Sequence, residues 1–210
     1  MALDLEEQEQ LAELKAWWRQ HGGRIVSIIV AVAVGFAGWV AFRSYSQSQA
    51  MQASVLYEAA VDATRANDAK ALRDASGTLA ESYPGTAYAS MGALLAARWY
   101  FDRNDLKSAK AQLQWVLERG YSDDFKHLAR LRLAAVLLDE KAYDEALNTL
   151  DGQPAAAYEA NYAALRGDIL VAKNQAAEAR AAYKLALEKA DRKNGPFQES
   201  VRMRLEALGG

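Results

Sequence analysis

The sequence has no cysteine and only three prolines among its 210 residues. Without cysteine, neither disulfides nor thiolate metal sites support the fold, and a cysteine nucleophile is excluded. A chain without thiols suits an oxidising compartment such as the periplasm, where stray thiols would mispair. The scarcity of proline, the abundance of alanine and the few β-branched residues beyond residue 64 together favour a helical protein.

The sequence also lacks an excess of basic residues and the motifs of common enzymes. Its formal net charge is −2, and residues 43–210 hold 22 Lys and Arg against 22 Asp and Glu. We therefore expect no nucleic-acid partner. There is no HExxH, GxSxG, Walker A or dinucleotide-binding glycine pattern. The sequence predicts that the protein is not an enzyme and has no catalytic residues, metal site or cofactor.

The sequence does contain an uncharged run of 18 residues, Ile25–Phe42. As a helix this run covers ~27 Å, close to the ~30 Å hydrocarbon core of a bilayer. Arg24 and Arg43 bracket it, and aromatic residues gather near both ends: Trp17, Trp18, Trp39, Phe42 and Tyr45. This pattern predicts a transmembrane anchor in contact with membrane lipid.

A cleaved signal peptide and a buried core helix are the alternatives to an anchor. A signal peptide has a short basic start and an apolar stretch of ~7–15 residues. Here 24 residues precede the run, and five of them are acidic. A core helix would keep a polar stripe, whereas this run offers only Ser27. A retained anchor is favoured over both.

The charges beside the run predict its orientation. Lys15, Arg19 and Arg24 lie just before it and only Arg43 lies just after it, and basic flanks stay cytoplasmic. In a bacterium this gives a single-pass inner-membrane protein with a cytoplasmic N-terminus and a periplasmic C-terminal domain. The expected division is a cytoplasmic amphipathic head at residues 1–24, the anchor at 25–42 and a periplasmic domain at 43–210.

Small residues recur along one face of the expected membrane helix, namely Ser27, Ala31, Gly35 and Gly38. Such a row lets a second helix approach closely, so we expect a helix-packing face there. The alternative is that glycine and alanine are simply common in membrane helices.

Small and apolar residues recur at a fixed spacing along the rest of the chain. Three sets share it: Ala97, Ala109, Leu113 and Val116; Ala134, Ala146 and Leu150; Gly167, Ala179, Tyr183 and Ala186. The leading residues of these sets are 37 and 33 residues apart, and a fainter copy starts at Ala60. This spacing brackets the ~34 residues of tetratricopeptide repeats, in which small residues lie where two antiparallel helices cross.

The repeats predict an all-α fold: an N-terminal transmembrane helix, then a tetratricopeptide-repeat-like α-solenoid of hairpins with a C-terminal capping helix. Short polar turns and the prolines divide the chain. The expected helices are 47–66, 69–82, 86–102, 106–119, 124–140, 143–151, 156–173, 176–190 and 197–207. An aperiodic helical bundle is the alternative.

A solenoid of hairpins presents a concave surface formed by the first helix of each repeat. The residues expected on it, as a groove for extended or partly folded polypeptide, are Met91, Leu94, Arg98, Phe101, Leu128, Leu131, Leu138, Asn161, Asp168 and Val171. The alternative is that these leucines are core residues and the register is off by one.

The chain resembles the ancillary SecYEG translocon subunit family, the YfgM-like proteins of Gram-negative bacteria. The resemblance lies in "EQLAELKAWWRQHGGR", in the anchor with its "GW", and in "LRLAAVLLDEKAYDEALNTLD" and "LRGDILVAKNQAAEARAAYKLAL". It covers the chain essentially from end to end.

The resemblance implies a non-enzymatic, membrane-anchored accessory subunit that associates with the SecYEG channel and a PpiD-like periplasmic chaperone during protein export. Secreted polypeptide clients are further expected partners. The alternative is an envelope regulatory or assembly adaptor with the same anchor and repeats.

Overall fold

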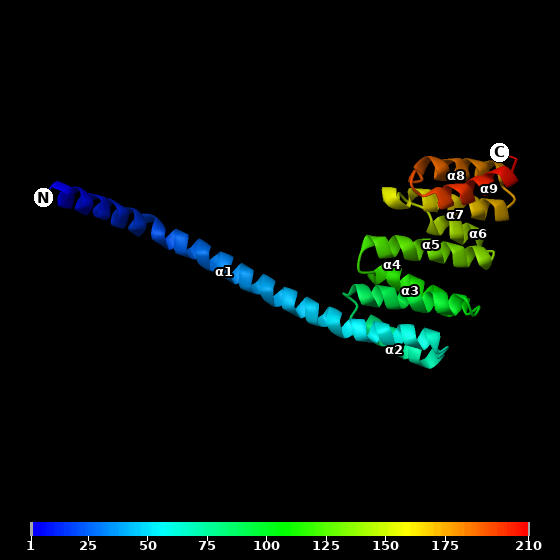
Figure 1. Ribbon diagram of the computed structural model, residues 1–210, viewed down its shortest axis with the longest axis horizontal. Coiled ribbons are helices and arrows are strands. Elements are labelled where there is room, and N and C mark those ends of the chain that lie inside the picture. Colours follow the sequence, from blue (N-terminus) through cyan, green and yellow to red (C-terminus); the bar gives the residue numbers. More distant parts are fainter. Residues whose placement is uncertain (1, 210) are drawn as a thin grey trace. The chain divides into compact units, whose positions relative to one another are not determined.

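The computed structural model describes residues 2–209 of the chain, with side chains for residues 9–209. Within these residues every regular element is a helix (Figure 1), which confirms the all-α prediction. The chain separates into two compact units, Met1–Gln49 and Ala50–Gly210.

The first helix, α1, runs without interruption over Ala2–Arg65. The prediction of a separate helix at 47–66 is therefore wrong. The first proline of the chain is Pro84, so no proline interrupts the helix between the apolar run and Arg65. The Gly22–Gly23 pair also fails to break the helix, since each glycine costs only about 1 kcal/mol there relative to alanine. The apolar part of α1 is long enough to cross a membrane, and side chains such as Val34 and Phe36 are 67% and 64% exposed.

The second unit is a series of antiparallel helical hairpins. Residues 50–65 of α1 pack with α2, and α3/α4, α5/α6 and α7/α8 follow as neighbours, with α9 against α8 (Figure 1). The bounds are α2 Ala69–Ser82, α3 Ala87–Phe101, α4 Leu106–Arg119, α5 Asp123–Asp139, α6 Tyr143–Thr149, η1 Ala156–Tyr158, α7 Glu159–Ala172, α8 Ala176–Lys189 and α9 Gly195–Ala207.

The expected register of the repeats is confirmed by burial. In each hairpin the leading small residue and the residue twelve positions later are both buried: Ala60 and Leu72, Ala97 and Ala109, Ala134 and Ala146, Gly167 and Ala179. At Gly167 an added Cβ would come within 2.6 Å of Cδ1 of Tyr183. Small residues therefore sit where the two helices of a hairpin cross most closely.

The four hairpins also close with the same turn. One residue in each turn has a left-handed φ of 57° to 61°: Asn67, Asn104, Lys141 and Asn174. The following backbone N–H donates to a carbonyl five residues back at 2.9 Å in all four turns, as Asp68 N does to Ala63 O. This is the 6→1 bond of a Schellman motif, which satisfies a terminal helix carbonyl.

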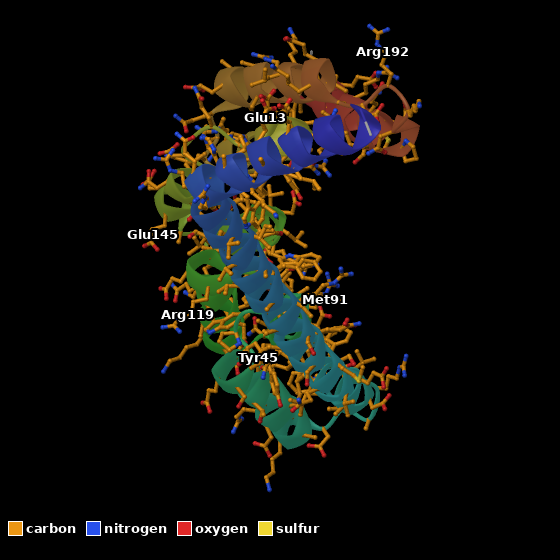
Figure 2. All side chains as sticks on the ribbon, turned by 90° about the vertical axis from the view of Figure 1, so that its left-hand side faces the viewer. Glu13, Tyr45, Met91, Arg119, Glu145 and Arg192 are labelled. Carbon is orange, nitrogen blue, oxygen red and sulfur yellow. The ribbon has the colours of Figure 1, made fainter. Side chains whose placement is uncertain are left out.

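Charged side chains of both signs stand out from the repeat unit, among them Arg119 on α4, Glu145 on α6 and Arg192 in the turn between α8 and α9 (Figure 2). Some of them join successive hairpins. Lys110 Nζ lies 2.6 Å from Glu140 Oε2, and Lys173 Nζ lies 2.5 Å from Asp144 Oδ1. The partners are partly exposed, so each pair adds at most a modest stabilisation.

Candidate functional site

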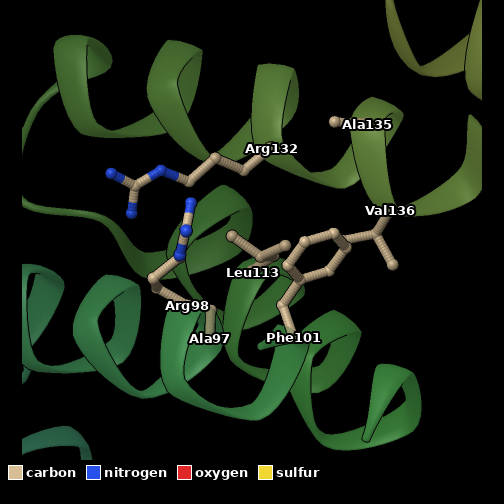
Figure 3. Close-up of a pocket in the computed structure, with 7 residues that line it drawn as sticks. All are labelled: Ala97, Arg98, Phe101, Leu113, Arg132, Ala135 and Val136. Atoms are coloured by element: carbon tan, nitrogen blue, oxygen red, sulfur yellow. The ribbon is translucent and has the colours of Figure 1, made fainter. Parts of the chain in front are cut away.

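A small pocket lies between α3, α4 and α5, which we call the Arg98–Arg132 pocket (Figure 3). Its cavity volume is about 130 Å³, and its lining residues are Ala97, Arg98, Phe101, Leu113, Arg132, Ala135 and Val136. Ala97, Leu113 and Val136 are almost fully buried. Because residues four apart share a helix face, α3 contributes the Phe101 ring directly beside Ala97.

Two arginines border this apolar pocket from different helices. Their guanidinium groups lie on the same side of the Phe101 ring (Figure 3). Arg98 Nε donates to Asp102 Oδ2 at 2.9 Å, and Arg132 Nη1 donates to the Leu94 carbonyl at 3.2 Å. No carboxylate among the described residues forms an ion pair with Arg132.

The half-buried position of Arg132 affects its titration. Desolvation by burial, together with the positive charge of Arg98, lowers the pKa of the Arg132 guanidinium. Arginine stays protonated at neutral pH even after such a shift. The pocket therefore holds two adjacent cations, one of which has no described counter-ion.

The residues expected on the groove occupy several environments. Arg98 and Phe101 line the pocket, and Met91 is partly buried on α3. Leu94 is only 5% exposed and belongs to the core, so the structure corrects its placement on an open surface. Three leucines of α5 are partly buried against the same core: Leu128, Leu131 and Leu138.

The expected groove residues of α7 do not line this pocket. Asn161 is exposed, and Val171 is 38% exposed. Asp168 accepts hydrogen bonds from Tyr183 Oη at 2.8 Å and from Arg204 Nη1 at 2.9 Å, so it joins α7 to α8 and α9. Burial, reinforced by this hydrogen bond, raises the pKa of the Tyr183 phenol above its usual range.

Sequence reasoning missed Leu113, Arg132, Ala135 and Val136 as pocket residues. On α5 it followed the leucines at 128, 131 and 138, whereas the pocket-lining face is turned toward residues 132 and 136. The expected face of α5 and the face that lines the pocket thus differ by about one residue, from Leu131 to Arg132. The available signal was Arg132 itself, which with Arg130 is one of two charged residues in the mainly apolar run of residues 128–138.

The small residues of the expected membrane face are exposed on α1: Ser27, Ala31, Gly35 and Gly38. Ser27 Oγ donates to the Gly23 carbonyl at 2.8 Å, which satisfies the hydroxyl within the helix. A Cβ added to Gly35 or Gly38 would meet nothing within 4 Å. A helix partner at this face stays a prediction.

Two further clusters have their polar groups engaged inside the fold. A second pocket, beside α7 and α8, is lined in part by Glu159, Arg166 and Lys189. Lys189 pairs with Glu159, and Arg166 pairs with Asp151 outside the lining, each at 2.9 Å. His127 Nδ1 lies 2.9 Å from Tyr162 Oη. Among residues 9–209, no three His, Asp or Glu side chains are grouped to hold a metal ion.

Comparison with known proteins identifies a family that the chain matches. The tetratricopeptide repeat-like domain model matches residues 15–210. A protein of Neisseria gonorrhoeae described as "Ancillary SecYEG translocon subunit" is 30% identical over 209 residues, which is 99% of this chain and all of that protein. A protein of Haemophilus influenzae with the same description is 27% identical, over 99% of this chain and 100% of that protein. A third, from Escherichia coli, is 30% identical over 87% of this chain and 87% of that protein.

The helical hairpins and the similarity over nearly the whole length agree with one another. The chain therefore belongs to the ancillary SecYEG translocon subunit family, a non-enzymatic family with a tetratricopeptide repeat-like domain.

Proposed function

We propose that this protein is a single-pass inner-membrane scaffold that holds partner proteins beside the SecYEG translocon during export. The observation that carries the proposal is the match to relatives described as ancillary SecYEG translocon subunits over 99% of this chain. The proposed division is a cytoplasmic head at residues 1–24, a membrane anchor at 25–42 and a periplasmic repeat domain at 43–210.

The proposed orientation is supported by the basic residues that precede the apolar part of α1. Because the chain has no cysteine, single cysteines report topology cleanly. Gln10 and Glu178 are exposed positions in the two units. In intact spheroplasts, an impermeant maleimide should label Glu178→Cys and leave Gln10→Cys unlabelled until the membrane is permeabilised. The opposite pattern would reverse the proposed orientation.

The proposed partners are the SecYEG channel, a PpiD-like periplasmic chaperone and secreted polypeptides. The row of small side chains on α1 suits close packing of a second membrane helix. The repeat domain offers a surface for polypeptide, with Arg98 and Phe101 open on α3. The two units would thus act on different partners.

Purification of the full-length protein in mild detergent, followed by identification of co-eluting proteins, tests the proposal. Channel subunits and the chaperone should dominate. Gly35→Leu should reduce channel recovery if the small-residue face makes the contact, and Val34→Leu on the same helix is the matched control. Absence of channel subunits from the wild-type eluate would favour an envelope adaptor instead.

A further inference from the structure

The charges of the N-terminal part of α1 are separated by sign along the chain. All five acidic residues before the apolar run lie at or before Glu13, whereas the three basic residues follow it, at Lys15, Arg19 and Arg24. The next acidic residue after Glu13 is Glu58. No carboxylate among the side chains of residues 9–209 forms an ion pair with Lys15 or Arg19. These two cations therefore lie without a described counter-ion on the stretch of α1 that leads into the apolar run.

Lys15, Trp18 and Arg19 lie together on one face of α1. Residues three and four apart are neighbours on a helix surface, with Cβ atoms about 5–6 Å apart. Together with Leu14, these side chains line one hollow on the helix, and Trp18 is 52% exposed. We call these four residues the Lys15–Arg19 patch. The patch combines two cations with a half-exposed aromatic ring.

A glycine lets the Trp18 ring lie along the helix toward the apolar run. Gly22 is buried, and a Cβ added to it would lie 2.9 Å from Cε2 of Trp18. The indole is thus about one turn closer to Ile25 than its own Cα is. Gly22 precedes Ile25 by three residues, which is ~4.5 Å of helix. Because the headgroup layer on each side of a bilayer is roughly 5–7.5 Å deep, the ring lies at headgroup level when residues 25–42 span the membrane.

A ligand for this patch at the bilayer surface must carry negative charge beside an apolar body. An anionic phospholipid does so, because its phosphate is joined through glycerol to the acyl chains. A zwitterionic headgroup carries its own cation, which would repel Lys15 and Arg19. Tryptophan suits the same layer, because its ring is apolar and its N–H can donate to a polar group.

We infer that the Lys15–Arg19 patch binds the headgroup of an anionic phospholipid. The phosphate pairs with the two cations, and the Trp18 ring lies against the glycerol and the first part of an acyl chain. The inference rests on the proposed membrane anchor and goes beyond it by assigning a class of lipid to named residues.

Tryptophan quenching by brominated lipids tests the inference on the full-length protein in nanodiscs. In a protein with Trp17→Phe and Trp39→Phe, Trp18 is the only tryptophan left before Trp99. The nanodiscs hold a constant mixture of phosphatidylcholine and phosphatidylglycerol, and a varied amount of one lipid or the other carries bromine. Brominated phosphatidylglycerol should reach half-maximal quenching of Trp18 at an about fivefold lower mole fraction. Equal quenching by the two lipids would overturn the inference and leave the patch to a protein partner.

Charge variants identify the groups responsible. The double variant Lys15→Gln/Arg19→Gln should abolish the preference for brominated phosphatidylglycerol. Arg24→Gln is the matched control, because Arg24 is nine residues beyond Lys15 and therefore lies on the opposite side of α1. An unchanged preference in the double variant, or an equal loss in the control, would contradict the assignment.

A pair of glycine variants tests the position of the ring. Gly22→Ala should displace the Trp18 indole away from the bilayer and weaken its quenching by both brominated lipids, because the new Cβ would overlap the ring. Gly23→Ala should leave quenching unchanged, because an added Cβ there meets nothing within 4 Å. Equal quenching in the two variants would contradict the placement of the ring at headgroup level.

The anchor and the lipid assignment fail in different ways. In a companion protein with Trp17→Phe and Trp18→Phe, Trp39 reports insertion of the apolar run. Absence of Trp39 quenching by either lipid would contradict the anchor. Quenching of Trp39, together with equal quenching of Trp18 by the two lipids, would leave the anchor standing and contradict the lipid assignment.

Discussion

At the scale of single residues, each of the four hairpin turns requires one residue in the left-handed backbone conformation. Each turn has one residue at positive φ, and three of the four are asparagines. Asparagine tolerates this conformation because its short amide can hydrogen-bond locally, whereas a long side chain is strained there. Lys141 is the exception, with a φ of 61°.

Lys141→Asn should therefore stabilise the protein. We expect the free energy of unfolding to rise by about 0.5–1 kcal/mol, because the left-handed conformation is less strained for asparagine. Urea denaturation followed by circular dichroism measures the change. Lys193→Asn, an equal change in a turn without positive φ, should have little effect. An equal gain in both variants would show that loss of the charge is the cause.

The buried phenol of Tyr183 gives stability a dependence on alkaline pH. Its pKa is raised in the folded protein by burial and by the bond to Asp168, while the unfolded chain ionises near 10.0. The stabilisation is complete below pH 10 and is lost as the pH rises further, at about 1.4 kcal/mol per pH unit. Tyr183→Phe should flatten the decline of unfolding free energy between pH 10 and 11. Tyr121→Phe, at a tyrosine that is 59% exposed, is the control.

At the scale of elements, the sequence predicted the hairpins far better than the first helix. The bounds of α2 and α4 match the expected ranges, because asparagine turns and prolines divide that part of the chain. Nothing comparable interrupts α1 before Arg65. Spacing alone also could not fix which face of α5 lines a pocket, since Arg132 and Leu131 are neighbours and the rotation between them is about 100°.

The close crossing of α7 and α8 depends on a glycine, Gly167, which has no side chain to meet Tyr183. Gly167→Ala should lower the free energy of unfolding by about 1–3 kcal/mol, because the new Cβ would overlap the rigid ring of Tyr183. Gly77→Ala, in the middle of α2 with nothing within 4 Å of an added Cβ, should instead raise it by about 0.5–1 kcal/mol. Thermal melts separate the two signs, and destabilisation by both would contradict the close-contact explanation.

At the scale of the whole molecule, the boundary between the two units falls inside a helix. The unit that begins at Ala50 includes the last turns of α1. Ala53 and Ala60 from those turns are buried together with Leu79 and Leu72 of α2. The repeat domain therefore needs residues 50–65 to complete its first hairpin.

A fragment of residues 50–210 should accordingly fold in detergent-free buffer with one cooperative transition. Removal of residues 50–65 should expose Leu72 and Leu79 and cost about 3 kcal/mol or more, since each leucine contributes roughly 1.5–3 kcal/mol by burial. The expected fall in Tm is about 6–12 °C. Equal melting temperatures for fragments 50–210 and 66–210 would show that the first hairpin is complete without α1.

The uniform closing bond of the four turns makes the stack modular. A duplicate of the stretch from Thr86 to Ser122, inserted after Ser122, would bring its own left-handed asparagine and its own pair of crossing helices. Because each hairpin in such an array contacts mainly its immediate neighbours, the insertion would lengthen the stack between its first hairpin and α9. The length of the stack is thus open to change by gene duplication alone, without a new design for any contact between hairpins.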